Sequence, residues 1–306
     1  MTNFLPEGYL TAMGQQCCFR NMAQVNEAMA QGKMLEARAI VCDSDHNLIV
    51  DLGVIKGIIP REECAIGIAE GYTRDIAIIS RVNKPVCFQI TSVKADEKFK
   101  PYAILSRRSV QLACQEYYIQ KLTPGDVIKG KITHLEAFGC FVDIGCGIIS
   151  LLPIDAISVS RISHPKDRFH IGQNVNAVVK SIGDDGKICL SHKELLGTWE
   201  ENASKFQNGE TVAGIIRSVE SYGIFVELTP NLAGLAELKD DVKVGQNASV
   251  YIKSLIPERM KIKLIIVDSF DAPHQNTNFE YFIENGHIEN FQYSPDACQK
   301  VVETIF

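Results

Sequence analysis

The sequence of 306 residues lacks long apolar stretches. It contains no run of about 18 consecutive apolar residues, which is the length that a membrane-spanning helix needs. Its first residues show no charged segment followed by an apolar one, so we expect no signal peptide. We therefore expect a cytoplasmic protein without a membrane partner.

A positive net charge is also missing, since the formal net charge is −6 at pH 7. Such a chain has no general attraction for nucleic acid. An RNA-binding surface would therefore need a local concentration of basic residues.

Motifs of metal sites and of catalysis are absent too. His164 and His170 are six residues apart and Cys17 and Cys18 are adjacent, and neither pair has the spacing of zinc ligands. No glycine-rich loop ends in Lys followed by Ser or Thr to hold phosphate. No stretch combines a nucleophile, a base and an orienting group. We therefore expect no metal, no cofactor, no small-molecule substrate and no enzymatic activity.

Ten cysteines are too few for a disulfide framework in a chain of this length. Most of them lie inside apolar runs, as Cys87, Cys140 and Cys189 do. Free cysteine behaves as a small apolar residue, and cytosolic thiols stay reduced. These cysteines therefore indicate core positions of a cytosolic protein.

Five short strand-like runs are present between residues 122 and 194. They are rich in Ile, Val and Phe and are separated by Gly, Asp and Asn, which is typical of strands joined by turns. Five such strands in about 70 residues predict a small closed barrel of the OB type. The runs are Val127–Ile132, Phe138–Asp143, Ile148–Leu152, Ala177–Lys180 and Lys187–Ser191.

The same pattern occurs again downstream. Tyr222–Glu227 repeats Phe138–Asp143 at a distance of 84 residues, and Gly245–Ala248 repeats Gly172–Val175 at a distance of 73 residues. The later copy therefore lacks eleven residues in one loop, as expected for tandem domains. Residues 33–109 read as a third, degenerate copy.

We therefore predict a mainly β protein of three tandem five-stranded OB barrels joined by short helices. A short helix in residues 21–30 is expected to precede them, and a polar segment from Asp271 to Asn278 and a short helix from Pro295 to follow. The predicted parts are an N-terminal helical segment (1–33), a degenerate barrel (34–109), a helical linker (110–122), a barrel (123–194), a second linker (195–206), a barrel (207–269) and a C-terminal tail (270–306).

The motifs of the central copy resemble the RNA-binding repeat of the bacterial ribosomal protein S1 family. They are Pro-Gly-Asp at 124–126, Phe-Gly-x-Phe-Val-Asp at 138–143 and Gly-Gln-x-Val at 172–175. The resemblance covers residues 33–269 and implies an OB barrel that binds single-stranded RNA. Where many members have a His after the third strand, this chain has Pro153 and Glu237.

The resemblance also implies which residues bind RNA. Two aromatic residues on the second strand match Phe138 and Phe141 in the central copy and Tyr222 and Phe225 in the last. A basic residue before the last strand matches Lys187 and Lys261. In the first copy His46 and Ile49 stand at the aromatic positions.

Exposed aromatic rings beside a cationic groove bind unpaired bases by stacking. The alternative is that Phe138 and Phe141 belong to the core, because residues three apart on a strand point to opposite faces. Gly139 would permit a bulge that turns both rings to one side.

The loop that the last copy lacks is basic. It contains Arg161, His164, Lys166 and Arg168. Arg can bind phosphate with two parallel hydrogen bonds, so these residues are candidates for contacts with the RNA backbone. The alternative is a solvated loop in which Arg161 or Arg168 forms a structural salt bridge.

Two classes of function remain. The first is an RNA-binding protein of translation, with single-stranded RNA or mRNA and the small ribosomal subunit as candidate partners, and with the central copy as the principal RNA site. The second is a regulatory or accessory factor whose barrels mainly bind protein, or an accessory protein of RNA decay.

Overall fold

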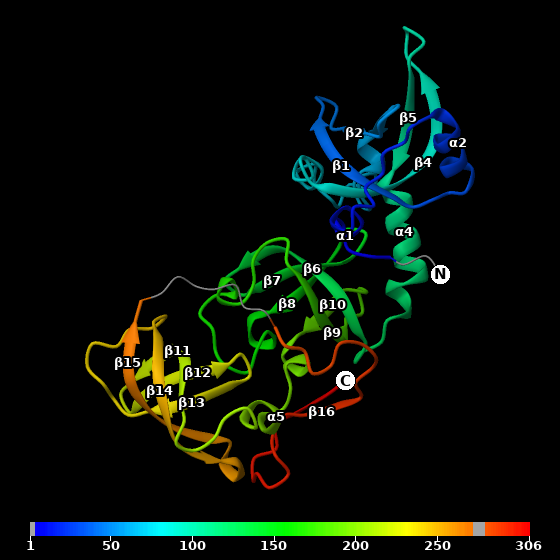
Figure 1. The fold of residues 1–306 in the computed structure, drawn as a ribbon. Helices are drawn as coiled ribbons and strands as arrows, with labels where there is room; N and C mark the ends of the chain where they lie inside the picture. The colour runs from blue at the N-terminus through cyan, green and yellow to red at the C-terminus, as the bar shows by residue number, and fades with distance from the viewer. Residues whose placement is uncertain (1–3, 272–278) are drawn as a thin grey trace. The chain divides into compact units, whose positions relative to one another are not determined.

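A computed structural model of the chain describes residues 4–271 and 279–306, and three closed five-stranded barrels account for most of them (Figure 1). The predicted mainly β fold with three barrels is confirmed. The residue limits assigned to each domain stay a prediction, and the polar segment predicted at Asp271–Asn278 lies, apart from Asp271, outside the described residues.

The strands of each barrel have one topology. Barrel 1 contains β1 (Leu35–Cys42), β2 (Leu48–Asp51), β3 (Lys56–Ile59), β4 (Pro85–Ala95) and β5 (Pro101–Ser106). Barrel 2 contains β6 (Val127–Glu136), β7 (Gly139–Gly145), β8 (Ile148–Pro153), β9 (Asn174–Ile182) and β10 (Ile188–Ser191). Barrel 3 contains β11 (Thr211–Glu220), β12 (Gly223–Thr229), β13 (Leu232–Ala236), β14 (Asn247–Ile256) and β15 (Lys261–Phe270). In each barrel the third and fifth strands pair in parallel, and the other pairings that the structure describes are antiparallel.

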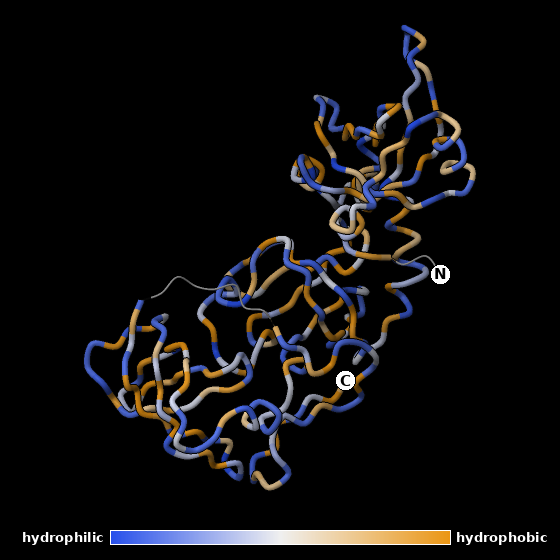
Figure 2. Tube along the Cα trace, viewed as in Figure 1, coloured by the Kyte–Doolittle hydropathy of each residue, from blue (hydrophilic) through white to orange (hydrophobic). Residues whose placement is uncertain are grey.

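Alternation of apolar and polar residues builds the barrel cores. On β15 the side chains of Ile262, Leu264 and Ile266 are buried, whereas Lys261 and Lys263, which alternate with them, are exposed. Successive side chains of a strand point to opposite faces, so one face of each strand fills the barrel. Figure 2 shows apolar residues distributed along the strands of all three barrels.

Short helices precede and connect the barrels. The helix expected near residues 21–30 is α2 (Met22–Ala30), whose first turn is capped by the Asn21 side chain. After barrel 1 come α4 (Arg107–Tyr117) and the 3-10 turn η2 (Ile119–Lys121). After barrel 2 come the 3-10 turn η5 (Lys193–Leu196) and α5 (Trp199–Ala203). The smaller elements are α1 (Tyr9–Ala12), η1 (Arg61–Glu63), α3 (Ile76–Ile79), η3 (Ile154–Ala156), η4 (Pro165–Asp167) and η6 (Pro257–Arg259).

The chain forms two compact units. One unit consists of residues 1–122 with the β7–β8 turn at 143–149, and the other of residues 123–142 and 150–306. Along the part of the chain that the structure describes, no helix is long and apolar enough to cross a membrane.

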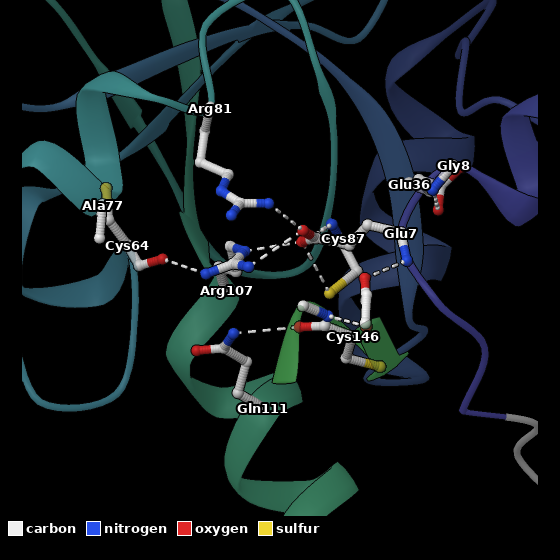
Figure 3. A network of polar contacts seen from close by, with 12 residues as sticks. Glu7, Gly8, Glu36, Cys64, Ala77, Arg81, Cys87, Arg107, Gln111 and Cys146 are labelled. Carbon is white, nitrogen blue, oxygen red and sulfur yellow. Dashed lines mark hydrogen bonds and ion pairs between the residues drawn. The ribbon is translucent and has the colours of Figure 1, made fainter. Parts of the chain in front are cut away.

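A buried polar network holds the first unit together (Figure 3). The Glu7 carboxylate accepts hydrogen bonds from the Arg107 guanidinium at 2.6 and 3.0 Å and from the Cys87 backbone N–H at 3.0 Å. Burial alone would raise the pKa of Glu7, but the charge and hydrogen bonds of Arg107, the charge of Arg81 and the Cys87 N–H together outweigh it and lower that pKa. A Cβ atom at Gly147 would lie 1.9 Å from Arg107 Nη2, so only glycine fits in this turn.

The C-terminal tail does not form the helix expected from Pro295. Instead β16 (Asn290–Gln292) and β17 (Glu303–Ile305) pair antiparallel, and Phe291 and Tyr293 are buried in the cluster that contains the core of barrel 3. Tyr293 also accepts a hydrogen bond from the Trp199 backbone N–H at 2.9 Å. These contacts hold the tail extended, and they make it a structural part of the second unit.

Candidate nucleic-acid interface

Barrel 2 exposes an aromatic pair at the start of its second strand. Phe138 stands in the two-residue turn between β6 and β7, and Phe141 lies in β7. Their ring centroids are 6.1 Å apart and the ring planes meet at 87°. Phe138 is 56% exposed, so it is not a core residue. The ring of Phe138, the outer ring of the pair, is therefore available for stacking.

Barrel 3 repeats this geometry. The rings of Tyr222 and Phe225 have centroids 6.2 Å apart and planes at 88°. Tyr222 is 67% exposed. Two barrels therefore present the same edge-to-face pair, each with a largely exposed outer ring.

Barrel 3 shows how the matching Gly223 is used. The register shifts along β12 lie between Ile216 and Ser218 on the neighbouring β11 and between Glu227 and Thr229, and neither is at Gly223. Tyr222 stands in the turn before β12, so strand alternation does not apply to it. The role of Gly223 is close approach, because a Cβ atom there would lie 2.7 Å from the Ala236 carbonyl oxygen.

A lysine that the sequence analysis missed extends the aromatic row of barrel 3. Phe225 pairs with Leu235 on β13, and Leu235 pairs with Lys263 on β15. Side chains paired across neighbouring strands share a face of the sheet. The predicted Lys261 lies two positions before Lys263 on β15. It is exposed and pairs with Ile256 of β14. The alternation of lysine and apolar residues on β15 was the signal that could have identified Lys263.

Barrel 2 has no lysine at the matching place. Leu151 of β8 pairs with Cys189 of β10, where barrel 3 pairs Leu235 with Lys263. The predicted Lys187 precedes β10, is highly exposed and forms an ion pair with Asp185 at 2.5 Å, which raises its pKa. Ion pairs between exposed groups are weak, so this pair does not withhold Lys187 from a ligand.

The basic loop (residues 158–170) lies on barrel 3. The Ser160 backbone N–H donates to the Pro230 carbonyl at 3.0 Å. The Val159 N–H donates to Asn231 Oδ1 at 3.1 Å. The basic loop of barrel 2 is thus hydrogen-bonded to the turn between β12 and β13 of barrel 3.

Arg168 is a correction to the predicted set of phosphate-binding residues. It is 3% exposed and forms an ion pair with Glu227 of β12. Arg217 of β11 also binds Glu227, with Nε 2.7 Å from Oε2. The guanidinium of Arg168 is therefore used inside the protein, which was the structural alternative for this residue.

The other predicted residues of the loop are closer to solvent. Arg161 and Lys166 are exposed, and His164 is half-buried. His164 Nδ1 accepts a hydrogen bond from the Lys166 backbone N–H at 3.1 Å and caps η4. His164 therefore has a local structural role, and Arg161 and Lys166 are the loop cations available to a ligand.

A groove of about 420 Å³ brings Arg161 together with the aromatic pair of barrel 3. Phe138 and Phe141 do not line it, so this groove joins the basic loop to the aromatic pair of barrel 3 and not to that of barrel 2. The lining residues are Val159, Ser160, Arg161, Arg217, Ser218, Glu220, Tyr222, Phe225 and Ala233.

No potential metal site occurs among residues 4–271 and 279–306, where no three His, Cys, Asp or Glu side chains are grouped to hold an ion.

Comparison with known proteins identifies the family. Residues 121–193 match the family model of the S1 RNA binding domain. The chain is 28% identical over 268 residues to the small ribosomal subunit protein bS1 of Leuconostoc lactis, covering 85% of this chain and 59% of that protein. It is 30% identical over 262 residues to the small ribosomal subunit protein bS1 homolog of Bacillus cereus, covering 82% of this chain and 64% of that protein. Residues 121–193 belong to the S1 domain family, and the chain is similar to bS1 proteins over more than four fifths of its length.

The chain spans less than two thirds of the length of both relatives. Among solved structures it is similar to GSP13 from Bacillus subtilis, with 29% identity, 23% of this chain and 55% of that chain covered, and a TM-score of 0.22.

Proposed function

We propose that this chain is a non-enzymatic protein of translation that binds single-stranded RNA or mRNA through barrels 2 and 3. The S1 family model matched by barrel 2 is that of an RNA-binding domain, and the curated relatives are named as proteins of the small ribosomal subunit. The small ribosomal subunit is therefore a candidate partner, and the bacterial cytoplasm the expected location.

The observation that carries this proposal is the repeated aromatic pair. Two barrels hold Phe138 with Phe141 and Tyr222 with Phe225 in the same edge-to-face geometry, with the outer ring more than half exposed. A fold needs no such ring on its surface. Every base has a π-face, so an exposed ring binds unpaired bases with little sequence preference, at about 1–3 kcal/mol per base.

Barrel 1 has a different surface at the same place. Ile49 of β2 pairs with Ile58 of β3, which pairs with Ile104 of β5, so aliphatic side chains occupy the row that holds Phe225 in barrel 3. Aliphatic side chains offer no ring for a base to stack on. We assign barrel 1 to protein contact in this proposal, and RNA binding to barrels 2 and 3.

Fluorescence anisotropy of the full chain with a fluorescein-labelled dodecauridylate tests the proposal. We expect binding that weakens as salt is raised, because phosphate contacts release counterions. A blunt RNA duplex of the same length is the control and should bind more weakly, since its bases are already stacked. Equal affinity for both RNAs, or no binding to either, would contradict the proposal.

A further inference from the structure

We propose that the RNA site of barrel 3 is completed by barrel 2. In this composite site, one unpaired base stacks on Tyr222 and Phe225, and the adjoining phosphate binds Arg161 from the basic loop. The inference rests on the proposed RNA binding and adds which residues act together. Neither barrel alone contains both parts.

The position of Arg161 relative to the rings is fixed by its neighbours in the chain. Ser160 is buried and is bound to barrel 3 through its backbone N–H, which donates to Pro230, and through its hydroxyl, which donates to the Thr229 carbonyl at 3.3 Å. The Ser158 hydroxyl donates to the Ser160 carbonyl at 2.9 Å. The residue directly before Arg161 is thus held on the strand end that follows the aromatic pair.

A second set of contacts anchors the far end of the loop. Arg168 and Arg217 both bind Glu227, and Arg217 Nη1 lies 4.0 Å from an Asp167 carboxylate oxygen. Two arginines and two carboxylates make this cluster neutral. It fixes the loop on barrel 3 but leaves no net charge for RNA.

Arg161 is the cation that remains for a ligand in the groove. It is exposed and forms no ion pair with any residue that the structure describes. Its guanidinium can bind two phosphate oxygens at once. The groove volume of about 420 Å³ lies in the range of small-ligand sites, so it can take one nucleotide.

Glu220 is the charge in the groove that opposes a phosphate. It lies at the end of β11, is exposed, and lines the groove with Arg161. Replacing Glu220 by Gln removes this negative charge and keeps the shape, so the Glu220→Gln variant should bind RNA more tightly than the wild type.

The test uses the full chain and a fluorescein-labelled hexauridylate, with one aromatic platform removed at a time. In the Phe138→Ala background only barrel 3 keeps its exposed ring. There Arg161→Ala should weaken binding roughly five- to tenfold and flatten the slope of log K against log salt by about 0.7. Lys166→Ala is the matched control, because it removes the same charge from the same loop but does not line the groove.

The Tyr222→Ala background gives the opposite arrangement. Only barrel 2 then keeps its exposed ring, and Arg161→Ala should weaken binding no more than Lys166→Ala does. If Arg161→Ala lowers RNA affinity more in the Tyr222→Ala background than in the Phe138→Ala background, Arg161 acts with barrel 2. That result would overturn the composite site. Equal effects of Arg161→Ala and Lys166→Ala in both backgrounds would overturn it as well. In those two cases RNA binding itself still stands, whereas a wild-type chain that binds no hexauridylate refutes the proposed function together with the composite site.

Discussion

Asp143 of barrel 2 and Glu227 of barrel 3 stand at the same place on the second strand, 84 residues apart, yet they bind different parts of the chain. Asp143 accepts the backbone N–H of Glu7 at 2.8 Å and that of Gly145 at 2.9 Å. Burial and the nearby Glu7 charge raise the pKa of Asp143 to about 7. The Glu227 carboxylate instead forms ion pairs with Arg168 and Arg217.

Barrel 1 supplies a third case. Its Asp51 occupies the matching place but is exposed, and it accepts the backbone N–H of Gly53 at 2.9 Å. Asp51 and Asp143 thus share a local contact with the glycine two residues later, whereas Glu7 at Asp143 and Arg168 at Glu227 come from distant parts of the chain. Features set by a local turn, such as the aromatic pairs, repeat between barrels 2 and 3. Features set by distant segments do not.

The largest effect that separates these carboxylates should be on stability. Glu227→Gln leaves the buried Arg168 without its charge partner and removes the closer of two carboxylates from Arg217, so it should lower the free energy of unfolding of the second unit by about 3–5 kcal/mol. Urea denaturation of the full chain measures it. Glu237→Gln is the matched control in the same barrel, since Glu237 is exposed and should change stability by less than about 0.5 kcal/mol. Equal stabilities of the two variants would show that the Arg168 and Arg217 contacts do not hold the loop.

The next effect should be a loss of stability at low pH that comes from barrel 2, after its last strand, and that the matching position of barrel 3 does not contribute. His192 follows β10, is buried among Phe169, Phe279 and Tyr281, and burial lowers its pKa to about 4. The corresponding residue of barrel 3 is Ile266, which does not titrate.

The direction of the pH effect follows from the lowered pKa. An unfolded histidine has a pKa near 6.5, so the unfolded state binds more protons between about pH 4 and 6.5. The stability that the neutral imidazole gives is fully present above pH 6.5 and is lost as the pH falls to 4, by about 3 kcal/mol. His192→Gln should remove this part of the pH dependence, as measured by thermal unfolding at several pH values. If the His192→Gln variant shows the same dependence of stability on pH as the wild type, His192 does not contribute to the loss of stability in acid.

The aromatic platforms should show the next effect, on RNA affinity. Phe138→Ala and Tyr222→Ala should each weaken binding of single-stranded RNA by about 1–3 kcal/mol and leave the salt slope unchanged, because each removes a stacking surface and no charge. Phe99→Ala is the control, since Phe99 is 89% exposed on barrel 1 and has no assigned role. Anisotropy titrations measure all three. A loss from Phe99→Ala as large as from the other two would mean that exposed aromatic area alone, and not the platforms, governs binding.

The smallest effect concerns the lysine that one barrel has and the other lacks. Lys263→Ala should lower the salt slope by about 0.7, the value for one phosphate contact on a single strand. Cys189→Lys places a lysine at the matching point of barrel 2 and should raise the slope by a similar amount. If neither substitution moves the slope, the row that contains Phe225 and Lys263 is not on the path of the RNA backbone.

How much the sequence could predict depends on the distance between partners. The barrels and the aromatic pairs are local patterns, so the strand-like runs predicted the barrels, and the related segments Phe138–Asp143 and Tyr222–Glu227 indicated the aromatic pairs. The burial of Arg168 depends on Glu227, 59 residues later in another barrel, and no spacing within the loop indicates that partner. The extended tail depends in the same way on Trp199 and on the core of barrel 3.

The central claim is that RNA lies on the aromatic platforms of barrels 2 and 3 and not on barrel 1. Photo-crosslinking of the full chain to a short RNA containing 4-thiouridine, followed by tryptic digestion and mass spectrometry, tests it most directly. We predict cross-links in the peptides 132–161 and 218–239, which contain Phe138 with Phe141 and Tyr222 with Phe225. Cross-links confined to residues 34–109 would contradict the account.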